Sequence, residues 1–141
     1  MSKIITNSEK ETKAWAKKLS KQLTGGRVVS LEGNLGSGKT VIVKAVAKAL
    51  GIKEIVNSPT FVLMKVYKVR SGPIKNLVHV DAYRLDGATE LLEIGLADYL
   101  GQPDSLVLIE WGDKVKEILP SDAFRIKIAH RGGSKREISV K

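Results

Sequence analysis

The sequence contains no cysteine, only four prolines and few aromatic residues, which make up 5% of the chain. Without cysteine, neither a disulfide framework nor a thiolate metal site can form. No apolar run approaches the ~18 residues that a membrane-spanning helix needs. The first residues, MSKIITNSEKE, are too polar for a secretory signal. We therefore expect a cytoplasmic protein.

Length and composition favour one globular domain. The chain has 141 residues, of which 43% are hydrophobic and 28% are charged. No linker, repeat or low-complexity tract interrupts it, so we expect a single domain over residues 1–141. The net charge of +9 is compatible with a polyanionic partner. Because the lysines are scattered along the chain, the charge by itself predicts no nucleic-acid interface.

Hydrophobic spacing predicts alternating helices and strands. Helices are expected over residues 8–23, 39–50, 88–100 and 114–119. Strands are expected over residues 27–32, 55–69, 77–83, 105–110, 124–129 and 136–141. Strands joined by a helix are typically parallel, whereas those joined by a short turn form antiparallel hairpins. The pattern therefore predicts a three-layer α/β domain with a mixed sheet and antiparallel hairpins.

The segment GNLGSGKT, residues 33–40, fits the pattern G-x-x-x-x-G-K-[ST] between an expected strand and an expected helix. Its glycines let backbone N–H groups point toward a phosphate, and the following helix adds the positive end of its dipole. Lys39 is expected to bridge the β- and γ-phosphates of a nucleoside triphosphate, and Thr40 to offer its hydroxyl oxygen to Mg²⁺. The pattern thus predicts a P-loop NTPase-like domain. The loop residues are Gly33, Asn34, Leu35, Gly36, Ser37, Gly38, Lys39 and Thr40.

Two acidic residues follow apolar strands. Asp81 comes after LVHV and Glu110 after SLVLI, and α/β sheets bind ligands at the carboxyl ends of their strands. The residues alone leave the roles of the two acids open. A GTPase is disfavoured because the chain has neither a guanine-reading Asn/Thr-Lys-x-Asp nor an Asp-x-x-Gly switch. A small-molecule kinase would need a lid over its second substrate, for which the chain has little room.

Other polar and aromatic residues are weaker candidates. Trp111 is placed to lie near a nucleotide, and Arg84 to neutralise transition-state charge. The alternative for Arg84 and its neighbour Tyr83 is a salt-bridged surface turn. His79 and His130 have no second metal ligand at usable spacing, so we expect both to be structural or exposed.

Several segments together resemble the TsaE (YjeE) family, the P-loop ATPases of bacterial tRNA threonylcarbamoyladenosine biosynthesis. In order along the chain these are GNLGSGKT, SPTF, HVDAYRL, LLEIGLADYL and IEW, followed by LP and a closing hairpin. The resemblance implies a subunit that binds and hydrolyses ATP with Mg²⁺ and supports threonylcarbamoylation of adenosine 37 in tRNA. It implies TsaD and TsaB as protein partners, with any contact to tRNA made through their complex.

The family pattern also implies roles for individual residues. It assigns Mg²⁺ to Thr40 and Glu110, places Asp81 near the γ-phosphate and Trp111 beside the nucleotide, and makes the SPTF segment with Thr60 a switch-like region. The residues expected to act in catalysis are therefore Asp81, Glu110 and Lys39, and the switch-like residues are Thr60, Tyr83 and Arg84.

The chain departs from the family pattern at two positions. Asn34 stands where Asp is usual, and Val41 stands where a second Thr is usual. The first change removes a charge at the mouth of the loop, and the second removes a hydroxyl near the α-phosphate. Two other functions stay open on sequence alone: a nucleotide-dependent assembly module with incidental turnover, and a small P-loop kinase.

Overall fold

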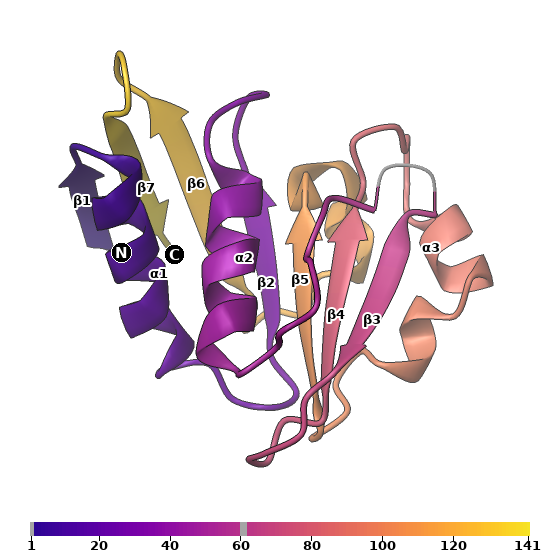
Figure 1. Cartoon of the computed structure of the whole chain (residues 1–141). Helices are drawn as coiled ribbons and strands as arrows, with labels where there is room; N and C mark the ends of the chain where they lie inside the picture. The colour runs from indigo at the N-terminus through magenta and orange to yellow at the C-terminus, as the bar shows by residue number, and fades with distance from the viewer. Residues whose placement is uncertain (1, 60–61) are drawn as a thin grey trace.

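The computed structural model describes residues 2–59 and 62–141. Within them, a mixed sheet of seven strands forms the centre of the domain in the order β1-β7-β6-β2-β5-β4-β3 (Figure 1). The strands are β1 (Ser2–Thr6), β2 (Val28–Glu32), β3 (Met64–Lys68), β4 (Asn76–Asp81), β5 (Ser105–Glu110), β6 (Phe124–His130) and β7 (Arg136–Val140). The helices are α1 (Glu9–Ser20), α2 (Lys39–Ala49), α3 (Thr89–Glu93) and the 3₁₀ helices η1 (Leu96–Asp98) and η2 (Gly112–Ile118).

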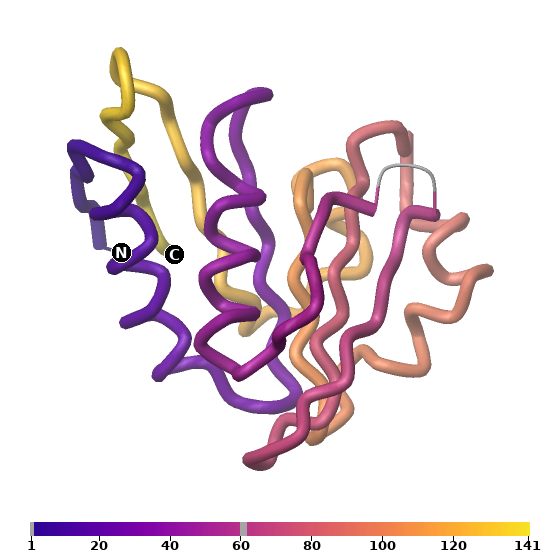
Figure 2. Tube along the Cα trace, viewed as in Figure 1, coloured from indigo at the N-terminus to yellow at the C-terminus, as the bar shows by residue number. Residues whose placement is uncertain are grey.

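Parallel strands occupy the middle of the sheet and antiparallel pairs its edges. β2 lies between β5 and β6 and runs parallel to both, and β4 is parallel to β5. β3 joins β4 as an antiparallel hairpin, and β6, β7 and β1 form an antiparallel edge. Both ends of the chain therefore lie at the same edge, close together, as the trace in Figure 2 also shows.

Both faces of the sheet are covered, which buries the central strands completely. β2 and β5 consist of buried residues only, as expected for parallel strands packed on two sides. Successive side chains point to opposite faces. Leu31 contacts the cluster formed with α1 and α2, whereas Val28 contacts the cluster formed with α3 and the segment after it. The predicted three-layer α/β fold with a mixed sheet and antiparallel hairpins is confirmed.

Two local predictions were wrong. The helix expected over 88–100 is interrupted, because Gly95 has a positive φ of 102° and separates α3 from η1. The strand expected over 55–69 is reduced to β3. Residues 55–59 lie in no strand, and residues 60–61 are outside the described part of the chain.

One strand and two helix boundaries also differ from the expectation. β1 was not predicted, since SKIIT is short and four of its five residues are exposed. Its strand conformation depends on pairing with β7, which is distant in sequence. α1 ends at Ser20 rather than near residue 23, and the short helix expected over 114–119 is η2, which contains a kink at Val115. None of the helices in the described ranges is long and apolar enough to cross a membrane.

Candidate nucleotide-binding site

The glycine-rich loop joins β2 to α2, as the sequence pattern predicts. Two glycines show why the loop needs them. A Cβ on Gly33 would lie 2.4 Å from the Ile128 carbonyl oxygen and 2.7 Å from Ser37 Oγ, so a side chain there cannot be accommodated. Gly38 has φ 112° directly before α2, a left-handed conformation that glycine adopts without steric cost. The first N–H groups of α2 are thereby turned toward the loop.

The ammonium group of Lys39 lies over this loop. Its Nζ donates to the carbonyl oxygens of Gly33 and Asn34 at 2.6 and 2.8 Å and to Ser37 Oγ at 3.3 Å. It also lies 4.3 Å from the centroid of the Trp111 ring. The residue is only 5% exposed. A cation is therefore fixed where the pattern predicts the phosphates to bind.

Burial lowers the pKa of Lys39 from its ordinary value of 10.5, because desolvation penalises the charged form. Three carboxylates act in the opposite direction and favour the cation. In order of effect they are Glu110, Asp81 and Asp113. The Lys39 ammonium is thus held away from water. A poorly solvated cation favours binding of an anionic ligand.

Thr40 and Glu110 meet at the start of α2. Thr40 Oγ1 donates to Glu110 Oε1 at 2.7 Å, and Glu110 is 3% exposed. The other carboxylate oxygen of Glu110, Oε2, lies 2.6 Å from Nε2 of His79. A carboxylate can only accept, so the imidazole donates from Nε2. Both oxygens of Glu110 are therefore oriented by neighbouring side chains.

Asp81 lies beside Glu110, since the two residues are register partners on the parallel strands β4 and β5. Asp81 Oδ2 accepts from Ser58 Oγ at 2.5 Å, and Oδ1 accepts from the Tyr83 N–H at 3.0 Å. The Tyr83 ring lies 5.0 Å from the Trp111 ring, centroid to centroid. The second acid thus belongs to a different hydrogen-bond network from the first, and that network includes the segment at Ser58.

These groups enclose a cavity of about 470 Å³, which falls in the usual range for small-molecule sites. Of the predicted site residues, those that line it are Leu35, Gly36, Gly38, Lys39, Thr40, Asp81, Tyr83, Arg84, Glu110 and Trp111. Gly33, Asn34 and Ser37 hold the Lys39 ammonium instead. Thr60 lies outside the described residues. Val41, one of the two positions that depart from the family pattern, also lines the cavity.

Three side-chain contacts that orient the site were not predicted from the sequence. His79, expected to be structural or exposed, is fully buried and contacts Glu110. Ser58 holds Asp81. Arg136 on β7 donates from Nε to the carbonyl oxygen of Ser37 at 2.7 Å and from Nη2 to that of Gly36 at 3.3 Å. No local pattern reveals these contacts, because the paired residues are 23 to 100 positions apart.

The donors at the start of α2 fit a magnesium ion. A threonine hydroxyl and a carboxylate are hard oxygen ligands of the kind Mg²⁺ takes in nucleotide sites, together with phosphate oxygens and water. The described residues contain no group of three or more His, Cys, Asp or Glu side chains arranged around one metal position. This donor set therefore suits a metal site in which phosphate oxygens of a bound nucleotide complete the coordination.

Comparison with known proteins places the chain in one family. Residues 6–138 match the family model described as "Threonylcarbamoyl adenosine biosynthesis protein TsaE". The tRNA threonylcarbamoyladenosine biosynthesis protein TsaE of Bacillus subtilis (strain 168) is 40% identical over 135 residues, which cover 95% of this chain and 81% of the relative. The protein of that name from Treponema pallidum (strain Nichols) is 35% identical over 138 residues, 98% of each chain.

A solved structure agrees with the sequence relatives. The crystal structure of YdiB from Bacillus subtilis superposes with a TM-score of 0.78 at 36% sequence identity, covering 99% of this chain and 83% of that chain. The sheet and phosphate loop described above thus occur in a chain whose sequence matches one family model over nearly its full length. The protein belongs to the TsaE family.

Proposed function

We propose that this protein is a magnesium-dependent ATPase that supports threonylcarbamoylation of adenosine 37 in tRNA, acting with TsaD and TsaB. The observation that carries the ATPase proposal is the hydrogen bond between Thr40 Oγ1 and Glu110 Oε1. It brings the last residue of the phosphate loop against a buried acid of a neighbouring strand, an arrangement typical of Mg²⁺-nucleotide sites. The names of the relatives support the role in tRNA modification.

Each residue of the site has a task in this proposal. The N–H groups of the loop and the Lys39 ammonium bind and neutralise the phosphates. Thr40 and Glu110 hold Mg²⁺, which supplies further neutralisation of phosphate charge when bound. Asp81, held by Ser58 and by the Tyr83 N–H, orients the attacking water or reports the loss of the γ-phosphate to the segment containing Ser58.

Turnover measurements test the function as a whole. We expect Mg²⁺-dependent release of phosphate from ATP that increases when purified TsaD and TsaB are added. Tight ATP binding without hydrolysis, alone or with the two partners, would instead favour a nucleotide-dependent assembly module. Transfer of phosphate to a small acceptor rather than to water would favour a kinase.

Base preference provides a second measurement. ATP and ADP should bind better than GTP and GDP, since the sequence contains no guanine-reading motif. Competition of ATP and GTP against a fluorescent ATP analogue in the presence of Mg²⁺ measures this directly. A preference for GTP would contradict the ATPase proposal while leaving the phosphate loop unaffected.

Arg136 should support the loop from the far end of the chain. In Arg136→Gln, the carbonyl oxygens of Gly36 and Ser37 lose a charged donor, a loss of about 1.5–3 kcal/mol for each well-made bond. We expect weaker ATP binding and faster amide hydrogen exchange in residues 33–38. The matched control is Arg131→Gln on the same hairpin, because Arg131 pairs with Glu137 instead. Equal effects of both substitutions would show that only the hairpin matters, not its contact with the loop.

A further inference from the structure

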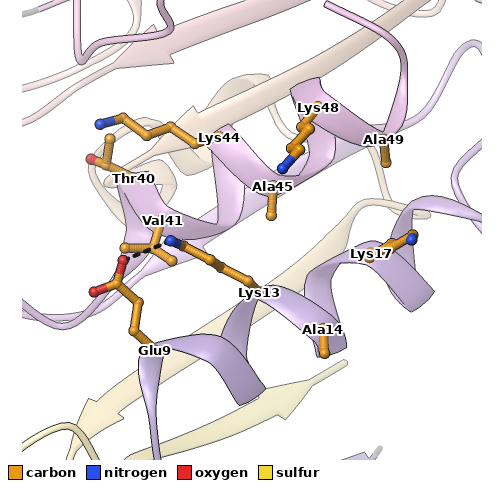
Figure 3. Close-up of a pocket in the computed structure, with 10 residues that line it drawn as sticks. All are labelled: Glu9, Lys13, Ala14, Lys17, Thr40, Val41, Lys44, Ala45, Lys48 and Ala49. Atoms are coloured by element: carbon orange, nitrogen blue, oxygen red, sulfur yellow. Dashed lines mark ion pairs between the residues drawn. The ribbon is translucent and has the colours of Figure 1, made fainter.

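A second and larger hollow, of about 680 Å³, lies between α1 and α2 (Figure 3). Its lining includes three alanines, Ala14 from α1 and Ala45 and Ala49 from α2, whose small side chains leave space between the helices. At one end it reaches Thr40 and Val41, which also line the candidate nucleotide cavity. The two hollows therefore adjoin at Thr40 and Val41, and the other described residues that line this one do not line the nucleotide cavity.

Lysines from both helices border this groove. α1 contributes Lys13 and Lys17, and α2 contributes Lys44 and Lys48. Each pair is spaced by four residues, so its members lie on one face of their helix. All four are exposed. The groove is therefore flanked on both sides by positive charge.

Acidic residues do little to balance these lysines. Among the described residues that line the groove, Glu9 is the one acid, and it forms an ion pair with Lys13 at 3.1 Å (Figure 3). Like charges at this spacing on a helix repel one another by a few tenths of a kcal/mol per pair. An anionic occupant would relieve that repulsion at both rims at once.

We propose that the groove between α1 and α2 binds an acidic amphipathic helix of a partner protein. Such a helix places apolar side chains against the alanines and carboxylates beside the lysines, the arrangement by which amphipathic helices bind grooves. α1 and α2 have 12 and 11 residues, so the groove can accommodate about three helical turns.

An RNA backbone fits the same groove less well. Its phosphates would form ion pairs with the lysines, but the alanines would have no apolar partner. Among the described residues, the lining contains no arginine and no aromatic residue, the side chains that most often stack on bases in RNA sites. Charge alone is compatible with either class of partner, and the apolar floor favours the helix.

The test uses a fluorescently labelled peptide about four helical turns long, with Leu and Ala at i, i+3, i+4 spacing and Glu at the remaining positions. A peptide of the same composition in shuffled order and a single-stranded RNA of similar length are the comparison probes. Binding is measured by anisotropy, and the contact surface by amide chemical shifts of the isotopically labelled protein. The test does not depend on nucleotide binding.

Two protein variants locate the binding surface. Lys17→Glu with Lys48→Glu reverses one charge on each rim at the end away from Thr40. Lys10→Glu with Lys18→Glu makes the same charge change at exposed α1 positions that do not line the groove. We expect the first pair to weaken binding of the ordered peptide by about tenfold or more, and the control pair by no more than about twofold.

A third variant separates shape from charge. Ala14→Trp fills the groove without altering its charge. It should therefore weaken binding of the ordered peptide and leave RNA binding unchanged. Thermal unfolding confirms that each variant is folded. The proposal is overturned if the shuffled peptide binds as well as the ordered one, if both charge pairs reduce binding equally, or if RNA binds the groove more tightly than the peptide.

Discussion

Replacing Lys39 with alanine should abolish productive ATP binding, with an affinity loss of at least about 100-fold, or about 2.7 kcal/mol. The side chain holds the cation over the phosphate loop, 2.6 and 2.8 Å from the Gly33 and Asn34 carbonyl oxygens. No other lysine among the described residues lines the cavity, so none can take over its role. Titration with a fluorescent ATP analogue in the presence of Mg²⁺ measures the effect, and unchanged affinity would contradict the phosphate-loop interpretation.

Lys39→Ala should fold normally in the absence of nucleotide. A loss of ATP affinity in this variant can then be assigned to lost binding and not to unfolding. Burial lowers the pKa of Lys39 below 10.5 in the folded state, so the unfolded chain binds more protons between the two pKa values. The free energy of unfolding therefore rises with pH through that range. At neutral pH Lys39 is charged in both states, so the full cost of burying its charge lowers the stability of the folded protein. We therefore compare the unfolding temperatures of wild type and Lys39→Ala across pH. The difference, wild type minus variant, should increase as the pH approaches 10.5. Lys44→Ala, which changes an exposed lysine five residues further along α2, is the matched binding control.

Substituting the two acids at the ends of β4 and β5 should separate binding from turnover. Glu110 contacts Thr40 at 2.7 Å, so Glu110→Gln should reduce the dependence of ATP affinity on Mg²⁺ as well as the affinity itself. Asp81 contacts Ser58 and the Tyr83 N–H instead, so Asp81→Asn should leave affinity nearly unchanged. The rate of ATP hydrolysis by Asp81→Asn in the presence of TsaD and TsaB should fall by about 100-fold or more, as expected for loss of a general base.

Each mutant is characterised by ATP affinity across a magnesium series and by hydrolysis with TsaD and TsaB. Asp86→Asn is the control, since Asp86 is exposed and does not line the cavity. Loss of magnesium-dependent affinity in Asp81→Asn, with retention in Glu110→Gln, would reverse the two assignments. If neither substitution changed hydrolysis, the two acids would not form a catalytic site.

Local sequence patterns predicted the parts of this fold that depend on local conformation. The phosphate loop was recognisable because the positive φ angles of Gly33 and Gly38 are a local requirement for glycine that the sequence pattern records. The apolar strands β2 and β5 were recognisable because burial on both faces demands continuous hydrophobic sequence. The interruption at Gly95 could not be distinguished from a tolerated helical glycine, since the surrounding leucines keep helical spacing.

Contacts between distant segments were not predictable from one sequence. β1 has little burial of its own and forms because β7 is available for pairing. His79 has an ordinary strand position, and its role follows only from the register that brings β4 beside β5. Arg136 is one of several basic residues near the C-terminal turn, and only the folded hairpin brings it to the loop. Most of the residues expected to contact a nucleotide therefore line one cavity, whereas the contacts that orient them were not predicted.

The dependence of the loop on late segments has a consequence for synthesis on the ribosome. Residues 33–40 emerge early, but Glu110 follows Thr40 by 70 positions and Arg136 follows Gly36 by 100. A partly synthesised chain therefore carries the glycines and lysine of the loop without the side chains that fix them. Such distant contacts form slowly and only after loop closure, so they are absent in the early stages of folding. The contacts from Arg136 to the loop form only after β7 has emerged and paired.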